Sequence, residues 1–308
     1  MQNYLNLLSE IIDKWIDKPD RTKTWVRWIF WTQMKFDLES GFPLITTKKM
    51  FLRWIVVELI WLIRWETNIK YLVDRNVKIW DEWPFQNYIN SNNLQEKFPK
   101  YSESWLEEKA KFIEKIKNSD KDDEFVKKWW DLWPIYGYQW RNFNWEWVDQ
   151  LKNALDMIKD NPSSRRIIVS AWNPAQIDKM LLPPCHMFYQ FEVDEINNKL
   201  NLQMYQRSAD MFLGIPFNIA SYSTLLILIS KITWLKAWEF THTIWDAHIY
   251  NNHFEQVKTQ IWRKPFLLPE LNIKKDLKTI EDLESLEWED FELLNYQSHP
   301  KINAPISV

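Results

Sequence analysis

The sequence predicts a single α+β domain spanning residues 1–308. Segments with helical apolar spacing are mixed along the chain with segments that are β-branched or alternate in polarity. Neither an internal repeat nor a Gly/Ser-rich linker divides the chain, and apolar residues make up 46% of it, enough for a substantial core. We therefore expect helices and strands to share one core.

The first half of the chain begins with a predicted amphipathic helix over residues 1–16, where charged residues interrupt the apolar positions. A polar loop at 20–24 follows, and residues 26–38 indicate a pair of strands. Residues 51–63 have the apolar spacing of a helix, whereas 68–81 begin as a helix and end as a loop.

Residues 86–128 differ from the rest of the chain in composition. They are rich in Glu, Lys, Asn and Ser and contain one weakly periodic helix, at 103–117. Such a composition provides few apolar residues for a separate core. We interpret the segment as a charged, solvated insertion within the domain.

The second half is predicted to contain both helices and strands. Two alternating segments, 187–193 and 200–205, flank the polar turn 194–198, which indicates paired strands. The other predicted elements are an amphipathic helix at 148–159, a β-branched strand at 166–171, an apolar helix at 219–232, a helix at 253–262 and a tail of short strands and loops.

Charge and apolar runs exclude several classes of protein. With 39 basic and 42 acidic residues the net charge is -3, so any bound phosphate needs local arginines. Charges within the first twenty residues exclude a secretory signal, and charges inside 51–63 and 219–235 favour buried helices over membrane spans. With a single cysteine, these features predict a cytoplasmic protein.

Cys185 is the sole cysteine, and Pro183 and Pro184 restrict the backbone just before it. It cannot form an internal disulfide, so its role is packing, metal binding or nucleophilic chemistry. On residue type alone, a buried thiol in the core is the commonest of these. His186 is a poor activator of the thiol, because neighbouring side chains on a strand point to opposite faces.

Candidate phosphate ligands stand beside polar or turn residues. Guanidinium groups suit phosphate oxygens, and a serine hydroxyl adds a donor, although a lone arginine is more often a surface charge. The candidates are Arg21, Arg165, Arg166, Arg207 and Ser208.

A series of ordered motifs resembles the thymidylate synthase family over nearly the whole chain, with only the insertion outside it. The motifs are DRT at 20–22, GFPL at 41–44, SRRIIVSAWN at 164–173, PCH at 184–186, YQRSAD at 205–210, GIPFNIASY at 214–222 and DAHIY at 246–250. The resemblance implies a mixed β-sheet packed with helices, a homodimer formed through that sheet, and no metal.

The resemblance also implies the chemistry. Cys185 would add to C6 of the uracil ring of dUMP, and C5 would then attack 5,10-methylenetetrahydrofolate, which also supplies the hydride that yields dTMP. Arg207 would contact both the sulfur and the phosphate. Arg21 and Ser208 would bind the same phosphate, and the partner subunit would donate its copies of Arg165 and Arg166.

Glu58 lies inside the apolar segment 51–63, where an unpaired carboxylate should have a raised pKa. The resemblance makes it the organiser of proton transfer at uracil O4, and Tyr136 the tyrosine that assists proton removal from C5. The alternative for Glu58 is an ion pair with Arg53, but five residues apart on a helix the two do not share a face.

The resemblance implies that Asn218, His248 and Tyr250 bind the nucleoside. An amide offers one acceptor and one donor to the uracil edge, although an asparagine before an apolar helix is often an N-cap. His248 and Tyr250 share a face on an extended segment and would bind the ribose hydroxyl; a structural histidine is the alternative.

The folate pocket is implied by the resemblance alone, because aromatic residues usually lie in the hydrophobic core and do not by themselves indicate a binding site. Its implied residues are Trp80, Trp83, Asp210, Leu213, Gly214 and Phe217. The tail 300–308, ending in Val308, would close over the bound folate and exclude water.

Two other functions stay open. A dUMP hydroxymethylase would share the fold and nucleophile but use water in place of hydride. A non-catalytic nucleotide- or RNA-binding relative would have lost its active site. The mass of the nucleotide product separates the first, and release of tritium from labelled dUMP tests the second.

The composition contains one anomaly: 22 tryptophans against three glycines. Glycine is normally about 7% of a globular protein. The family has glycine or another small residue at most of the positions occupied here by Trp25, Trp31, Trp65, Trp130, Trp133, Trp145, Trp147, Trp234, Trp238 and Trp245. Because the replacement runs in one direction, we hypothesise that the source reads UGA as glycine and that these tryptophans are a decoding artefact.

Overall fold

The computed structural model describes residues 1–308 except 15, 21–23, 121, 145 and 306–308. The described residues form two compact units. The first comprises Met1–Val56, Leu151–Ser170 and Cys185–Val308, and the second comprises Val57–Gln150 and Ala171–Pro184. The strands assigned within the described residues all belong to the first unit.

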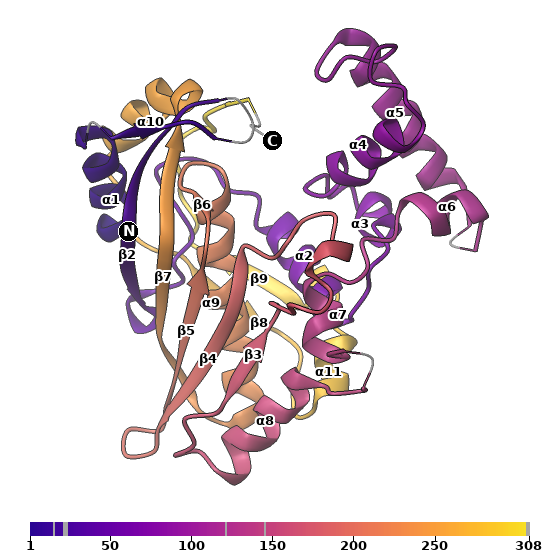
Figure 1. Cartoon of the computed structure of the whole chain (residues 1–308). Helices are drawn as coiled ribbons and strands as arrows, with labels where there is room; N and C mark the ends of the chain where they lie inside the picture. Colours follow the sequence, from indigo (N-terminus) through magenta and orange to yellow (C-terminus); the bar gives the residue numbers. More distant parts are fainter. Residues whose placement is uncertain (15, 21–23, 121, 145, 306–308) are drawn as a thin grey trace. The chain divides into compact units, whose positions relative to one another are not determined.

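A mixed seven-stranded sheet organises the first unit (Figure 1). Two strands run parallel to β7, and the other neighbours are antiparallel. The order is β1 (Asp17–Lys18), β2 (Val26–Asp37), β7 (Lys236–Tyr250), β5 (Lys199–Gln206), β4 (His186–Asp194) and β3 (Ile168–Ser170), with β6 (Ala209–Asp210) beside β7. The α+β class and the mixed sheet are confirmed.

Local sequence patterns predicted the β4–β5 hairpin correctly but not the partner of β2. In β5, every second side chain is buried, and β4 and β5 pair around the predicted turn. The strand pair predicted at 26–38 is wrong: this segment is one strand, whose partner is the distant β7. Alternation shows which face of a strand is buried, but it carries no information on the partner.

Helices cover the sheet of the first unit. The amphipathic α1 (Gln2–Asp13) packs against β2 and α10 (Phe254–Ile261), and α9 (Gly214–Thr233) packs against β5 and β7. Among the described helices, α9 alone has the length and hydropathy of a membrane span, but 78% of its apolar window is buried in the protein, as in a core helix. The first unit also contains α8 (Gln150–Asp160), β8 (Glu270–Ile273), α11 (Ile280–Glu284) and β9 (Phe291–Leu294), together with single 3-10 turns. The helix α2 (Leu52–Ile63) begins in the first unit and continues into the second.

The second unit is helical and includes the segment 86–128. Its helices are α3 (Lys70–Asp74), α4 (Glu82–Ser91), α5 (Glu103–Asn118), α6 (Glu124–Trp129) and α7 (Tyr136–Arg141). The helix predicted at 103–117 is confirmed as α5. Its charged residues face outward, while Trp105, Phe112 and Ile116 are buried, and the rings of Trp105 and Phe112 contact Phe85 of α4.

Several of the anomalous tryptophans have a left-handed backbone. Trp31, Trp65, Trp147 and Trp234 have φ between 49° and 58°. A Cβ makes this conformation costly for any residue but glycine, with asparagine a partial exception. The tryptophans that match family tryptophans, namely Trp61, Trp80, Trp83, Trp140 and Trp172, are not among the positive-φ residues. This contrast supports the hypothesis that the anomalous positions are glycines.

Two further features agree with that hypothesis. The β2–β7 ladder runs from Val26 to Asp37 without a Trp31–Trp245 rung, so two anomalous tryptophans meet at its one interruption. Trp130 is fully buried, and its indole Nε1 has no hydrogen-bond partner in the described chain. A buried donor without an acceptor is destabilising.

Candidate active site

The β4–β5 hairpin brings Arg207 to Cys185. Cys185 precedes β4, and Arg207 follows β5. The Arg207 backbone N–H donates to the Cys185 carbonyl at 2.9 Å, and its Nη2 lies 3.9 Å from the half-buried Sγ. A guanidinium at this position stabilises the thiolate, which is the nucleophilic form of cysteine. The pair is therefore arranged for nucleophilic chemistry.

A buried polar relay supports the turn that carries Arg207 and Ser208. Gln206 donates from Nε2 to the Ser208 carbonyl at 2.9 Å, and its Oε1 lies 2.9 Å from Nε2 of His242. Since an amide oxygen only accepts, the His242 proton is on Nε2. Burial lowers the pKa of His242 to about 3, so its ring is neutral. Sequence reasoning gave neither Gln206 nor His242 a role, because nothing in their spacing indicates this contact.

Asp210 begins the segment that leads into α9. Its Oδ1 accepts hydrogen bonds from the backbone N–H groups of Phe212 and Leu213, at 2.9 and 3.0 Å. β6 places Asp210 opposite His248 of β7. Gly214, the first residue of α9, has room for a Cβ beside Asp210, so close packing does not account for glycine there.

His248 and Tyr250 lie together on β7, as predicted. Their ring centroids are 5.2 Å apart, and His248 Nδ1 donates to Asp246 Oδ1 at 2.8 Å. Burial favours a higher pKa for Asp246, but hydrogen bonds from His248 and Lys18 outweigh it and lower the pKa. Asp246 belongs to the motif DAHIY, but the sequence predicted no separate role for it. In the structure it sets the His248 tautomer and leaves Nε2 as an acceptor for a hydroxyl.

Asn218 is inside α9 and is not its N-cap, which is Leu213. Its side chain is hydrogen-bonded to His186, whose ring also packs on Tyr222 at 5.5 Å. Burial lowers the pKa of His186 to about 4, so the ring is neutral at physiological pH. His186 therefore adds no positive charge near the thiol, and it contacts the amide of Asn218, which sequence reasoning missed.

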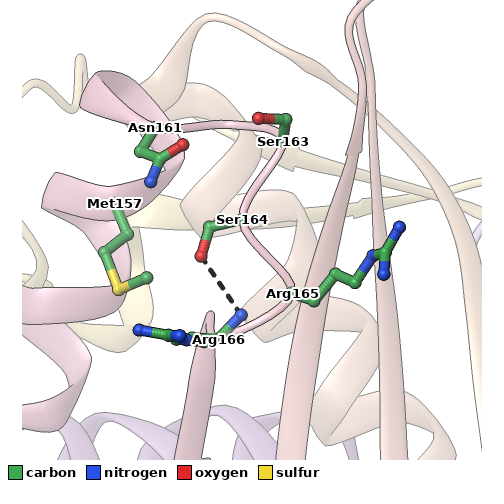
Figure 2. A pocket seen from close by; sticks show the side chains of 6 residues that line it. All are labelled: Met157, Asn161, Ser163, Ser164, Arg165 and Arg166. Atoms are coloured by element: carbon green, nitrogen blue, oxygen red, sulfur yellow. Dashed lines mark hydrogen bonds between the residues drawn. The ribbon is translucent and has the colours of Figure 1, made fainter.

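Arg165 and Arg166 lie in the loop before β3, where they line a pocket with Met157, Asn161, Ser163 and Ser164 (Figure 2). The Arg166 backbone N–H donates to Ser164 Oγ at 3.2 Å, and both arginine side chains are exposed. Since Ile168 pairs with Gln190 and a strand rises about 3.3 Å per residue, Arg166 is roughly 20 Å along β4 from Cys185. The structure does not bring these arginines to Cys185 of the same chain.

In the second unit, Glu58 of α2 meets two other predicted site residues. Trp80 donates from its indole to Glu58 Oε1 at 2.6 Å, and the Trp80 ring lies 6.2 Å from the buried ring of Tyr136. Burial raises the pKa of Glu58 to about 7, against the effect of the Trp80 hydrogen bond. A carboxyl group with this pKa can both donate and accept a proton near neutral pH. Trp83 is half-buried at the start of α4.

The raised pKa of Glu58 predicts a pH-dependent stability. An unfolded glutamate ionises near 4.5 and the folded one near 7, so the contribution of Glu58 to stability, about 3 kcal/mol, is fully present below pH 4.5 and is lost as pH rises through 7. Glu58→Gln should remove this dependence, as measured by urea unfolding between pH 4 and 8. Glu107→Gln, at an exposed site on α5, should leave it unchanged. Parallel curves for wild type and Glu58→Gln would contradict the assignment.

Two predicted site residues, Arg21 and Val308, lie outside the described residues. Leu213, Gly214 and Phe217 lie at the start of α9, in the first unit with Cys185, Arg207, Asp210 and Asn218. Within the described chain no group of three or more His, Cys, Asp or Glu side chains is arranged to hold a metal ion.

Comparison with known proteins identifies relatives over the full length. The family model described as Thymidylate synthase matches residues 2–308. A protein named thymidylate synthase from Mycoplasma mobile is 51% identical over 308 residues, and one from Malacoplasma penetrans is 50% identical, each with all of both chains covered. A thymidylate synthase from Phytoplasma mali is also 50% identical over the same span.

Proposed function

This chain belongs to the thymidylate synthase family, and from that premise we propose which residues perform its reaction. The enzyme is a methyltransferase that converts dUMP to dTMP, with 5,10-methylenetetrahydrofolate as the donor of both the one-carbon group and the hydride. The observation that carries the assignment of the site is the guanidinium of Arg207 beside the sulfur of Cys185.

Cys185 is the nucleophile. Its thiolate adds to C6 of the uracil ring, which makes C5 an enolate carbon able to attack the methylene group of the folate. Loss of the C5 proton and cleavage of the bond from the methylene to the folate nitrogen leave an exocyclic methylene at C5 and free tetrahydrofolate. Hydride from tetrahydrofolate then reduces the methylene, the sulfur–C6 bond breaks, and dTMP and dihydrofolate are released. Arg207 stabilises the thiolate before addition and again when the sulfur leaves.

Separate groups of residues bind the phosphate, the base and the ribose of the nucleotide. Arg207, Ser208 and Arg21 bind the phosphate. Asn218, oriented by neutral His186, pairs with N3–H and O4 of the base, and His248 and Tyr250 bind the ribose hydroxyl. The hydrogen bond from His248 to Asp246 supports this role, because it leaves a free acceptor on the ring.

Glu58 and Tyr136 transfer protons. The folate is bound by aromatic residues of the second unit and by residues at the start of α9. The pKa of about 7 suits Glu58 to exchange a proton with uracil O4 through water, and Tyr136 assists removal of the C5 proton. Trp80, Trp83, Asp210, Leu213, Gly214 and Phe217 bind the folate, and the tail ending in Val308 excludes water from the methylene.

The working form is a cytoplasmic homodimer joined through the sheet. On β4, Tyr189 and Phe191 are buried, whereas Phe188 on the opposite face is half-exposed and stacks on Tyr205 of β5 at 5.5 Å. An aromatic sheet face of this kind suits a second copy. Arg165 and Arg166 then bind the phosphate in the partner's site, which agrees with their distance along β4 from Cys185.

The shared site predicts complementation between two impaired variants, assayed at a dUMP concentration that saturates wild type but not Arg166→Ala. Arg166→Ala should weaken dUMP binding by about 10-fold or more, since it removes a charged phosphate contact. Refolding Arg166→Ala together with Cys185→Ala should restore up to about a quarter of wild-type activity, because half of the dimers are then mixed and each has one intact site. If both arginines act within their own subunit, the mixture stays no more active than its components.

Product analysis tests the reaction itself. With dUMP and methylenetetrahydrofolate, the nucleotide formed should have the mass of dTMP, with one dihydrofolate per turnover. A product with the mass of hydroxymethyl-dUMP would instead identify water as the final acceptor, and absence of tritium release from labelled dUMP would indicate a non-catalytic protein.

A further inference from the structure

One buried histidine outside the predicted site connects the nucleotide-binding strand to the C-terminal segment. His253 follows β7 and is fully buried. Its Nε2 lies 2.7 Å from the carbonyl oxygen of Pro305. Because a carbonyl only accepts, the ring carries its proton on Nε2 and donates it to the tail. Nδ1 has no hydrogen-bond partner within the described chain.

The same ring packs on Tyr250 of the proposed ribose site and on Phe212, close to the proposed folate site. Its centroid lies 5.7 Å from that of Tyr250, in an edge-on arrangement, and 5.4 Å from that of Phe212. Tyr250 in turn contacts His248 at 5.2 Å, and Phe212 adjoins the start of α9. Because these rings are in contact, a shift of the Tyr250 ring would displace the imidazole that is bonded to Pro305.

The contact with His253 is also the last described attachment of the tail. Upstream, Arg263 donates to the Pro300 carbonyl at 2.7 Å, and His299 is bonded to Lys264 and Thr46. Between described residues, the stretch 301–305 makes one hydrogen bond to the rest of the chain, the one from His253. His253 is therefore the donor that holds the end of the described part of the tail.

We propose that His253 is a positioning residue that anchors the C-terminal segment and couples its placement to nucleotide bound at Tyr250. This proposal rests on the roles proposed above for Tyr250 and the tail. Nucleotide at the ribose site fixes the Tyr250 ring, Tyr250 fixes the imidazole, and the imidazole holds Pro305 where the tail can cover the folate. His253 itself touches neither substrate.

The first test separates folate binding from nucleotide binding. His253→Phe keeps an aromatic ring and removes the donor. It should raise KM for methylenetetrahydrofolate roughly fivefold to tenfold, the range expected for one net hydrogen bond, with KM for dUMP changed less than about twofold. The share of hydroxymethyl-dUMP among products should rise. His253→Gln, which retains a donor, should recover part of the loss, and equal rises in both KM values would overturn the proposal.

A double-mutant cycle tests whether His253 acts through the tail. In a chain ending at Ala304, His253→Phe should have no further effect on folate KM, because its partner is gone. If His253→Phe and the truncation instead multiply each other's effects on the folate KM, His253 acts independently of the tail. His299→Phe is the matched control: it removes a histidine–carbonyl bond of 2.9 Å at the base of the tail, and should leave the product ratio unchanged.

Carboxypeptidase digestion measures tail anchoring without turnover. dUMP should slow release of the final residues from wild type, whereas His253→Phe should be digested faster and with little response to dUMP. No protection by dUMP in wild type would overturn the coupling. Protection that depends on His253, together with a truncated chain that binds folate normally, would keep the anchor and refute only the proposed role of the tail.

Discussion

Cys185→Ala is expected to abolish formation of dTMP, with a loss of at least about 10⁴-fold in kcat, since it removes the proposed nucleophile whose addition at C6 activates C5. The neighbouring guanidinium cannot substitute, because it has no lone pair to donate to carbon. Turnover is measured as dihydrofolate formation. In parallel, wild type incubated with a fluorinated dUMP analogue and folate should gain the mass of both ligands after denaturation, and Cys185→Ala should gain neither.

Binding of dUMP is the control for that experiment. Arg207 and Ser208 remain in place in Cys185→Ala, so the dissociation constant should stay within about tenfold of wild type. Loss of dUMP binding would indicate a disturbed β4–β5 hairpin rather than missing chemistry. Wild-type-like turnover in the variant would refute the covalent mechanism.

Replacing Trp31, Trp65, Trp147 and Trp234 together by glycine is expected to raise the free energy of unfolding by about 4 kcal/mol, at about 1 kcal/mol for each left-handed residue relieved. These side chains are 39–77% exposed, so removing them sacrifices little buried area. Trp65 and Trp147 are in ring contact at 6.2 Å, and their two contributions should not add independently. Urea unfolding measures the change, which is large against a total of about 5–15 kcal/mol.

Trp262→Gly is the matched control. Trp262 is 88% exposed but has φ of -71°, so glycine relieves no strain there and should lower stability or leave it unchanged. A similar gain at Trp262 would show that removal of any exposed indole stabilises the protein. The reading frame gives a direct test of the origin: UGG codons at Trp130, Trp133 and Trp245 would refute the decoding artefact.

Prediction from the sequence succeeded where the signal was local. The apolar period of α1 and α2, the alternation of β4 and β5, and the spacing of His248 and Tyr250 each depend on residues close together in the chain. It failed for β2, whose partner is more than 200 residues away, and the alternative of Asn218 as an N-cap is wrong, because α9 begins earlier than its apolar run. It also gave no role to Asp246, His242 or His253, whose partners in the fold are not indicated by spacing.

By itself, the sequence determined the family and the anomaly of its tryptophans, and it gave the nucleophile as a prediction, since motif order and composition do not depend on the path of the chain. Only the tertiary structure decided which nitrogen of each buried histidine carries the proton, why Glu58 retains one near neutral pH, and which indoles adopt a left-handed backbone. These properties arise from burial and from contacts between residues far apart in sequence, and they exist only once the chain has folded.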